Sequence, residues 1–179
     1  MAAGDGLVSM APTSIVAGSG TATVNADGGV DFSGATPITL NGVFTSAYDN
    51  YLIVMRSDSP TLDAAYARLR VSGTDASGSN YTYQRLTAAS TTVSGARSTS
   101  QTNWRVGDAS GSEYGDTFHL YGPALAQPTA YRTVNAGAFN GAEINEFAGT
   151  HSLSTSYDGF TVYSAVALTG NIHVFGYEE

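Results

Sequence analysis

The chain has 179 residues, of which 42% are hydrophobic and 12% charged, so it carries enough apolar material for one folded domain and is not a disordered chain. Its basic residues are seven arginines and its formal net charge is −8, which excludes a nucleic-acid-binding role, since that role needs clustered cations. There is no cysteine, no apolar segment of the roughly 20 residues that span a membrane, and no pattern of a secretory signal.

Residues 1–20 are expected to form an extended N-terminal arm. The segment is rich in Gly, Ala and Ser, and its sizeable apolar side chains are few and widely spaced: Leu7, Val8, Met10, Ile15 and Val16. Such side chains cannot bury one another, so the arm either stays mobile or docks on a neighbouring subunit. We therefore predict that these residues bind a partner, and that the folded domain spans residues 21–179.

From residue 21 onward the hydrophobic period is two, which is typical of β-strands. Short, half-exposed strands are predicted over residues 22–24, 30–32 and 38–40, with a hairpin loop over 25–29. The next run, residues 51–55, leaves no polar face. It is therefore predicted to be a central strand that is covered on both faces.

The segment 66–71 alternates cleanly, which points Ala67, Leu69 and Val71 inward and Tyr66, Arg68 and Arg70 outward. Later strands are predicted over residues 80–86, 102–106, 116–121, 131–136, 151–155, 160–166 and 171–177. About eight to ten such strands between Gly, Ser, Asp and Pro clusters indicate an all-β fold, an antiparallel, jelly-roll-like β-sandwich. Its predicted core contains Leu52, Val54, Leu69, Val71, Leu120, Val134, Val162 and Val174.

One segment is rich in acidic residues. Residues 107–116 contain Asp108, Glu113 and Asp116. Their carboxylate oxygens could bind a calcium ion, or two of the carboxylates could act as the catalytic pair of a glycosidase. The spacing fits no EF-hand or other short motif, so a solvated surface loop is the favoured interpretation, and calcium binding stays open.

The histidines give no metal motif. His119, His151 and His173 lie far apart, each within a strand pattern, and the clustered His-x-His of cupin-type metal sites is missing. They are expected to be ordinary hydrogen-bonded strand residues. A nucleophile elbow and a phosphate loop are missing too, and stretches such as 94–98 are expected to be loops. We therefore predict no enzymatic activity, no cofactor, and no catalytic, cofactor-binding or metal-binding residue.

The aromatic residues are dominated by eleven tyrosines. Tyr81 and Tyr83 project from one face of a predicted strand, with Tyr66, Arg68 and Arg70 expected nearby on another. Tyrosine has a flat apolar body and a hydroxyl, and arginine suits interfaces, so these residues are candidates for a subunit or glycan contact. The alternative is that the tyrosines are half-buried sandwich residues with their hydroxyls at the rim.

Several segments resemble small virion structural proteins of tailed bacteriophages. They are PTSIV (12–16), LNGVFTSAYDNY (40–51), RLR (68–70), NYTYQRL (80–86) and GNIHVFGY (170–177). The resemblance implies a β-sandwich head, often trimeric, that is made in the bacterial cytoplasm and resides in the virion, either decorating the capsid or as a tail appendage. It implies contacts with other copies of the chain, in a homotrimer, and with the major capsid protein or other virion subunits, and it supplies no catalytic residue.

Two placements in the virion compete. The short chain with an arm favours a capsid decoration protein, since a tail fibre or minor tail protein that contacts host-surface glycans usually has a longer stalk. A secreted carbohydrate-binding enzyme domain is disfavoured, because the secretory signal and an acid pair are missing. The number of copies in each virion separates capsid from tail.

Overall fold

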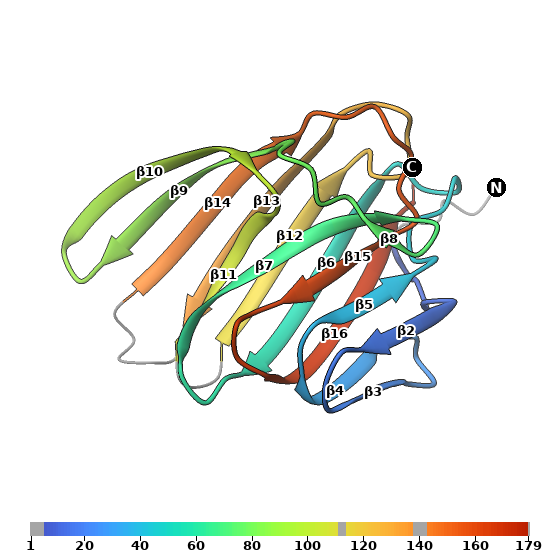
Figure 1. Ribbon diagram of the computed structural model, residues 1–179, viewed down its shortest axis with the longest axis horizontal. Helices are drawn as coiled ribbons and strands as arrows, with labels where there is room; N and C mark the ends of the chain where they lie inside the picture. The colour runs from blue at the N-terminus through green and yellow to red at the C-terminus, as the bar shows by residue number, and fades with distance from the viewer. Residues whose placement is uncertain (1–5, 111–113, 138–142, 179) are drawn as a thin grey trace.

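The structure, a computed structural model, describes residues 6–110, 114–137 and 143–178, and the regular elements among them are all β-strands. The strands form two antiparallel sheets that pack face to face (Figure 1). The predicted all-β, antiparallel, jelly-roll-like β-sandwich is therefore confirmed. Within the described part of the chain, no helix has the length and apolar character needed to cross a membrane.

The large sheet has ten strands. Its order is β10 (Thr92–Gln101), β9 (Tyr81–Ala89), β14 (Glu143–His151), β13 (Thr129–Gly137), β12 (Tyr114–Tyr121), β6 (Asn50–Asp58), β16 (Leu168–Tyr177), β4 (Val30–Ala35) and β3 (Thr21–Val24), and β1 (Leu7–Ser9) pairs with β16. The small sheet has six, in the order β11 (Trp104–Ser110), β7 (Leu62–Val71), β15 (Gly159–Tyr163), β5 (Ile38–Asn41) and β2 (Ser14–Ala17), with β8 (Thr74–Asp75) beside β7.

The small sheet covers only part of the large one. In Figure 1 the hairpin of β9 and β10 extends beyond the small sheet, and β10 is exposed along most of its length. This strand includes residues 94–98, which the sequence predicted to be a loop. A strand that is solvated on both faces needs no hydrophobic alternation, so the usual signal is missing there.

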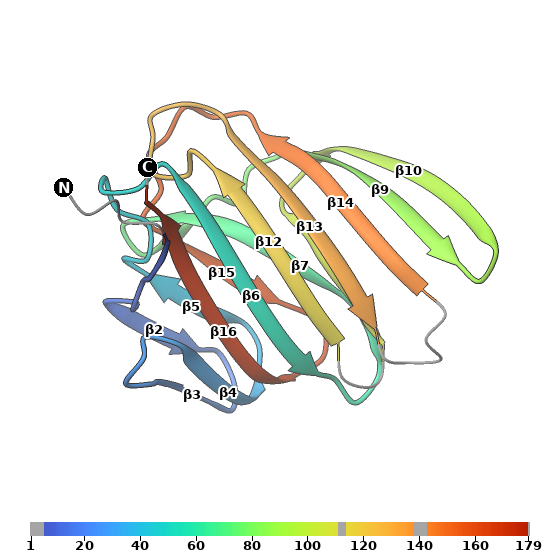
Figure 2. The same ribbon diagram turned by 180° about the vertical axis from the view of Figure 1, so that it is seen from behind.

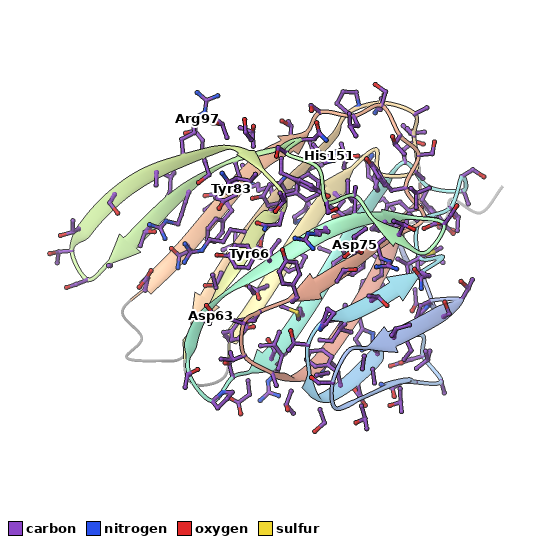
Figure 3. All side chains as sticks on the ribbon, in the orientation of Figure 1. Asp63, Tyr66, Asp75, Tyr83, Arg97 and His151 are labelled. Carbon is purple, nitrogen blue, oxygen red and sulfur yellow. The ribbon has the colours of Figure 1, made fainter. Side chains whose placement is uncertain are left out.

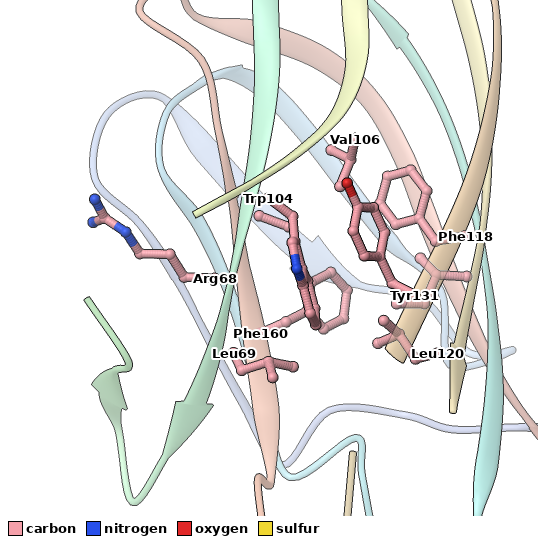
Figure 4. Close-up of a pocket in the computed structure, with 10 residues that line it drawn as sticks. Arg68, Leu69, Trp104, Val106, Phe118, Leu120, Tyr131 and Phe160 are labelled. Carbon is pink, nitrogen blue, oxygen red and sulfur yellow. The ribbon is translucent and has the colours of Figure 1, made fainter. Parts of the chain in front are cut away.

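The core lies between the sheets around Trp104, which is 1% exposed. Its ring stacks on Tyr131 with 4.5 Å between centroids and meets Tyr81 edge-on at 5.2 Å. A void of about 10 Å³ beside it is lined mainly by apolar side chains (Figure 4). Such a volume holds at most one water, so this is packed core and not a ligand site.

Half of the predicted core is confirmed: Leu69, Leu120, Val162 and Val174 are buried. Leu52 is only half-buried. The prediction is wrong for Val54, Val71 and Val134, since each of these side chains is 36% to 41% exposed. Val54 and Val134 point to the face of the large sheet that is turned away from the small sheet. Val71 ends β7 at the rim, directly before a tight turn in which Ser72 and Gly73 both have positive φ.

The central strand β6 is covered on one face only, which corrects the prediction for residues 51–55. Burial alternates along it, with Tyr51, Ile53 and Met55 buried and Val54 exposed. The strand lies between β12 and β16 in the middle of the large sheet, and Figure 2 looks onto its uncovered face. We call this surface of the large sheet the outer face. The apolar residues on the outer face are exposed and take no part in the core between the sheets.

The prediction of a separate arm over residues 1–20 is wrong for residues 7–17. β1 pairs with β16, β2 pairs with β5, and Met10 and Ile15 pack against the core. The two sheets have edges that these strands complete, and main-chain pairing compensates for the sparse apolar side chains. Residues 1–5 lie outside the described residues. Deleting residues 1–18 therefore removes two strands and cannot be expected to leave an intact head.

A buried histidine gives the fold a dependence on pH. His151 is fully buried against the ring of Tyr81, with 4.3 Å between centroids, and its Nδ1 lies 3.2 Å from the hydroxyl of Tyr157. Burial lowers the pKa of His151 to about 4, because the charged imidazolium is poorly solvated there. The folded protein therefore holds this side chain neutral under conditions in which the unfolded chain protonates it.

We expect stability to fall as the pH drops from about 6.5 to about 4, with a total loss near 3 kcal/mol from this group. Above that window neither state carries the proton, and below it both do, so the contribution is flat on either side. Denaturant unfolding of the wild type and of His151→Gln across this range measures the effect. Parallel stability curves for the two proteins would contradict it.

Candidate functional site

The structure does not bring the predicted contact residues together. Tyr66, Arg68 and Arg70 lie on the face of β7 turned away from the large sheet, whereas Tyr81 and Tyr83 are buried on the inner face of β9. Figure 3 shows this separation, with Tyr66 on the small sheet and Tyr83 on the large one. The shared face of Tyr81 and Tyr83 is as predicted, but it is the core face. Neither tyrosine is available to a subunit or a glycan.

Arg70 holds the small sheet together. Its guanidinium donates to Oδ1 of Asn41 at 3.0 Å, to Oγ1 of Thr161 at 2.9 Å, to Oδ1 of Asp75 and to the carbonyl of Gly73. Thr161 also donates to Asp75 at 2.7 Å. Arg70 points away from the large sheet, as predicted, but it is 9% exposed and its guanidinium is bonded within the small sheet, so it is not open to a partner. A buried cation needs such a set of partners, and here β5, β8, β15 and the turn between β7 and β8 supply them.

Arg68 and Tyr66 are half-buried beside this network. The guanidinium of Arg68 lies 4.8 Å from the ring centroid of Tyr163, and its Nε donates to the carbonyl of Thr102 at 3.0 Å. Tyr66 packs beside Tyr163, with 5.7 Å between ring centroids. Burial raises the pKa of the Tyr163 hydroxyl. These contacts are made within the small sheet and to the loop before β11. They explain the positions of Tyr66 and Arg68 without any bound ligand.

The outer face offers a more open surface. Strand register divides it into two halves. The first half, which we call the aliphatic half, carries five large aliphatic residues: Val54, Leu86, Val93, Val134 and Ile144. Each of these residues is between 40% and 72% exposed. In the strand register, Ala88 lies between Ile144 and Val93, Glu146 lies between Leu86 and Val134, and Thr117 lies between Val134 and Val54.

The second half carries a row of rings, Tyr121, His119 and Tyr177, which we call the aromatic row. The rings of Tyr121 and His119 are 6.4 Å apart and 14° from parallel. The hydroxyl of Tyr177 lies 3.0 Å from Nδ1 of His119, and this contact crosses over β6, which separates their strands. Tyr121 is 44% exposed, so its ring is open to solvent.

A shallow groove of about 560 Å³ lies beside the aromatic row, over β9, β14 and β13. Its lining includes Gln84, Leu86, Ala130, Glu146, Ala148 and Thr150. Ala148 opposes Gln84 on one side and Arg132 on the other, and Ala130 opposes Thr150 and Tyr121. The two alanines leave a depression between longer side chains. The volume is in the range of small-ligand sites.

Sequence reasoning missed both the aromatic row and the groove. The alternation of His119, Leu120 and Tyr121 was visible, and it places the two rings on one face of a strand. The same holds for Phe175 and Tyr177 near the C-terminus. The alternation does not reveal that these strands are close neighbours in the large sheet.

The residues considered for chemistry are dispersed. His119 and His173 lie on the outer face and His151 is in the core, each within a strand, as predicted. Asp116 belongs to β12 and not to a surface loop; it is buried and accepts a hydrogen bond from Nδ2 of Asn135 at 2.6 Å. Glu113 lies outside the described residues. Among the residues that the structure describes, no group of three or more His, Cys, Asp or Glu could hold a metal ion.

No family model and no curated protein sequence matches the chain. Among solved structures it is similar to the C-terminal CBM6 of LamC, a marine laminarinase from Zobellia galactanivorans (12% identity, 94% of this chain and 98% of that one, TM-score 0.34). It is also similar to the enzymatically active domain of tailspike protein 2 of bacteriophage CBA120 (11% identity, TM-score 0.33), covering 97% of this chain and 29% of that one. At TM-scores below 0.5 these likenesses carry no functional argument.

Proposed function

We propose that this chain is a non-enzymatic structural protein of a tailed-bacteriophage virion, and that it decorates the capsid. The main support for a decorating role is the aliphatic half of the outer face, where Ile144 is 57% exposed and Val93 is 72% exposed. Single exposed hydrophobic residues are common, but five large ones on the same sheet face mark an interaction surface. The virion assignment is supported by the resemblance of segments such as 40–51 and 80–86 to phage structural proteins.

The partners in this proposal are neighbouring virion subunits, which are other copies of the chain in a homotrimer and the major capsid protein. The outer face takes over the attachment role that the sequence assigned to residues 1–20. Of the arm residues, Met10 and Ile15 pack against the core, while Leu7 and Val16 stay exposed. A sheet face that is open to neighbours suits a lattice, because many weak contacts add up when copies are numerous.

Replacing Ile144 with glutamate tests the proposal, because it places a charge in the contact without disturbing the core. We expect Ile144→Glu to fold normally and to lose at least about tenfold in occupancy on particles purified from phage that lack the protein. Quantitative mass spectrometry of the particles measures occupancy. Copy numbers in the hundreds indicate the capsid, and a few tens or fewer indicate the tail.

Val16→Glu is the matched control. Val16 is 56% exposed, almost the same as Ile144, but it lies on the outer side of the small sheet. It should retain full occupancy. Full occupancy of particles by Ile144→Glu would refute the contact through the outer face. If only Val16→Glu lost occupancy, the N-terminal residues and not the outer face would be the attachment site.

A second candidate function is favoured by the groove and the aromatic row. A minor tail or receptor-binding protein that contacts host-surface glycans needs an open site with exposed rings and polar side chains. Tyr121 supplies such a ring, and Gln84 and Thr150 supply polar groups beside Ala130 and Ala148. This placement predicts the lower copy number.

A further inference from the structure

We propose that the groove over β9, β14 and β13, together with the aromatic row, binds a neutral oligosaccharide chain. The inference deepens the second candidate function and rests on it for its biological setting. Four features of the outer face support this ligand: the shape of the groove, its charge, its hydrogen-bonding groups and the rings at its border.

The shape comes from two alanines. Ala148 and Ala130 lie at diagonal positions of the neighbouring strands β14 and β13, where the surrounding residues have longer side chains, among them Gln84, Thr150 and Tyr121. The depression of about 560 Å³ is open to solvent along the sheet. A chain-like ligand can therefore lie in it without its ends being enclosed.

Among the lining residues, Glu146 carries the charge on the outer face. It accepts a hydrogen bond at 2.6 Å from Nε of Arg132, which lies beside the groove opposite Ala148, and the side chains of Arg132 and Glu146 are 55% and 38% exposed. Arg97 of β10 is exposed opposite Gln84, outside the lining. Arg85 also lines the groove, but it opposes the buried Phe147, so its side chain belongs to the inner face of β9. The chain as a whole carries a formal charge of −8, which repels polyanions. An uncharged ligand is thus favoured over an acidic one.

The polar groups suit a ligand rich in hydroxyls. The amide of Gln84 and the hydroxyl of Thr150 are exposed at the groove, and Glu146 lines it with its carboxylate. Arg132, which pairs with Glu146 and lies opposite Ala148 beside the groove, adds planar donors. Vicinal hydroxyls of a sugar ring can bond both members of such a pair. An apolar peptide would leave these groups without partners, which disfavours it.

The aromatic row extends the site. Tyr121 opposes Ala130 at the edge of the groove, and its near-parallel neighbour His119 is joined to Tyr177 by a hydrogen bond. Ring faces of this kind stack on the apolar face of a sugar. From β14 to β16 the site crosses four strand spacings, roughly 19 Å, which is enough for about four sugar rings.

The test uses the full chain with four probes: cellohexaose, laminarihexaose, mannohexaose, and the acidic hexagalacturonate. We expect calorimetry to show binding of at least one neutral hexasaccharide and none of the acidic one. Tyr121→Ala should weaken that binding about tenfold. Ala148→Trp fills the groove and should abolish it.

Ala136→Trp is the matched control, because Ala136 is an exposed alanine on the same face of β13 that does not line the groove. It should bind within about twofold of the wild type, and thermal unfolding should confirm that each variant is folded. The proposal is overturned if the wild type binds no neutral hexasaccharide, if it prefers the acidic one, or if Ala148→Trp binds normally.

Oligosaccharide binding and particle occupancy are separate measurements, so either proposal can fail alone. If Ala148→Trp loses occupancy on particles and the wild type binds no oligosaccharide, the groove belongs to a subunit contact and the glycan proposal is wrong. If oligosaccharide binding is lost while occupancy is retained, the two halves of the outer face serve different partners.

Discussion

Ile53→Asp is expected to lower the free energy of unfolding by more than about 4 kcal/mol, whereas the same change at the next residue, Val54→Asp, should cost only about 1 kcal/mol. Ile53 is 1% exposed between the sheets, and Val54 is 41% exposed on the outer face of the same strand. Aspartate at position 53 would bury a carboxyl without a partner. At position 54 it stays in water and loses mainly strand propensity.

Urea unfolding of the two variants measures both values under the same conditions. The pair controls for the strand, the sheet position and the added charge, and it differs only in the face. Equal losses at the two positions would mean that the outer face is covered in solution. In that case a measurement of oligomeric state against protein concentration would show whether another copy covers it.

Asp75→Ala should lower the free energy of unfolding by about 3 kcal/mol, because it leaves the guanidinium of Arg70 buried without a counter-ion. Asp75 accepts hydrogen bonds from Arg70 and Thr161, and Nη1 of Arg68 lies 3.9 Å from its other oxygen. The loss should be smaller for Asp75→Asn, which retains an acceptor for Thr161.

Glu146→Ala is the matched control, since it removes the carboxylate of an ion pair on the outer face, between Glu146 and Arg132. Glu146 and Arg132 are both largely solvated, so this change should cost less than about 1 kcal/mol. The unfolding midpoints of the three variants, measured by calorimetry, show which substitution lowers the stability most. A loss from Asp75→Ala no larger than that from Glu146→Ala would show that Arg70 does not depend on its carboxylate partner.

The local pattern of the chain was enough to predict the fold class. Residues 66–71 alternate, and the structure buries Ala67 and Leu69 on one side of β7 as that pattern indicates. The hairpin loop at 25–29 joins β3 to β4, and Gly28 adopts the positive φ that such a turn requires. These features depend on neighbours within a few residues, so the sequence alone carries them.

The site could not be predicted in the same way. Tyr81 and Tyr83 were correctly placed on one face, but that face packs against Trp104 and Phe147 in the core. The aromatic row unites β12 with β16, whose sequences are far apart. It exists because β6 pairs with both.

The sequence by itself determined which residues of a strand share a face, because successive side chains of a pleated strand point to opposite sides. It could not determine which face another sheet would cover. The small sheet covers one side of β6 and β13, and this alone separates buried Ile53 from exposed Val54 and leaves Val134 in water. The tertiary structure also decided that residues 7–17 belong to the sheets, where β1 pairs with β16 and β2 pairs with β5. These main-chain hydrogen bonds need strand edges that form only when the whole chain folds.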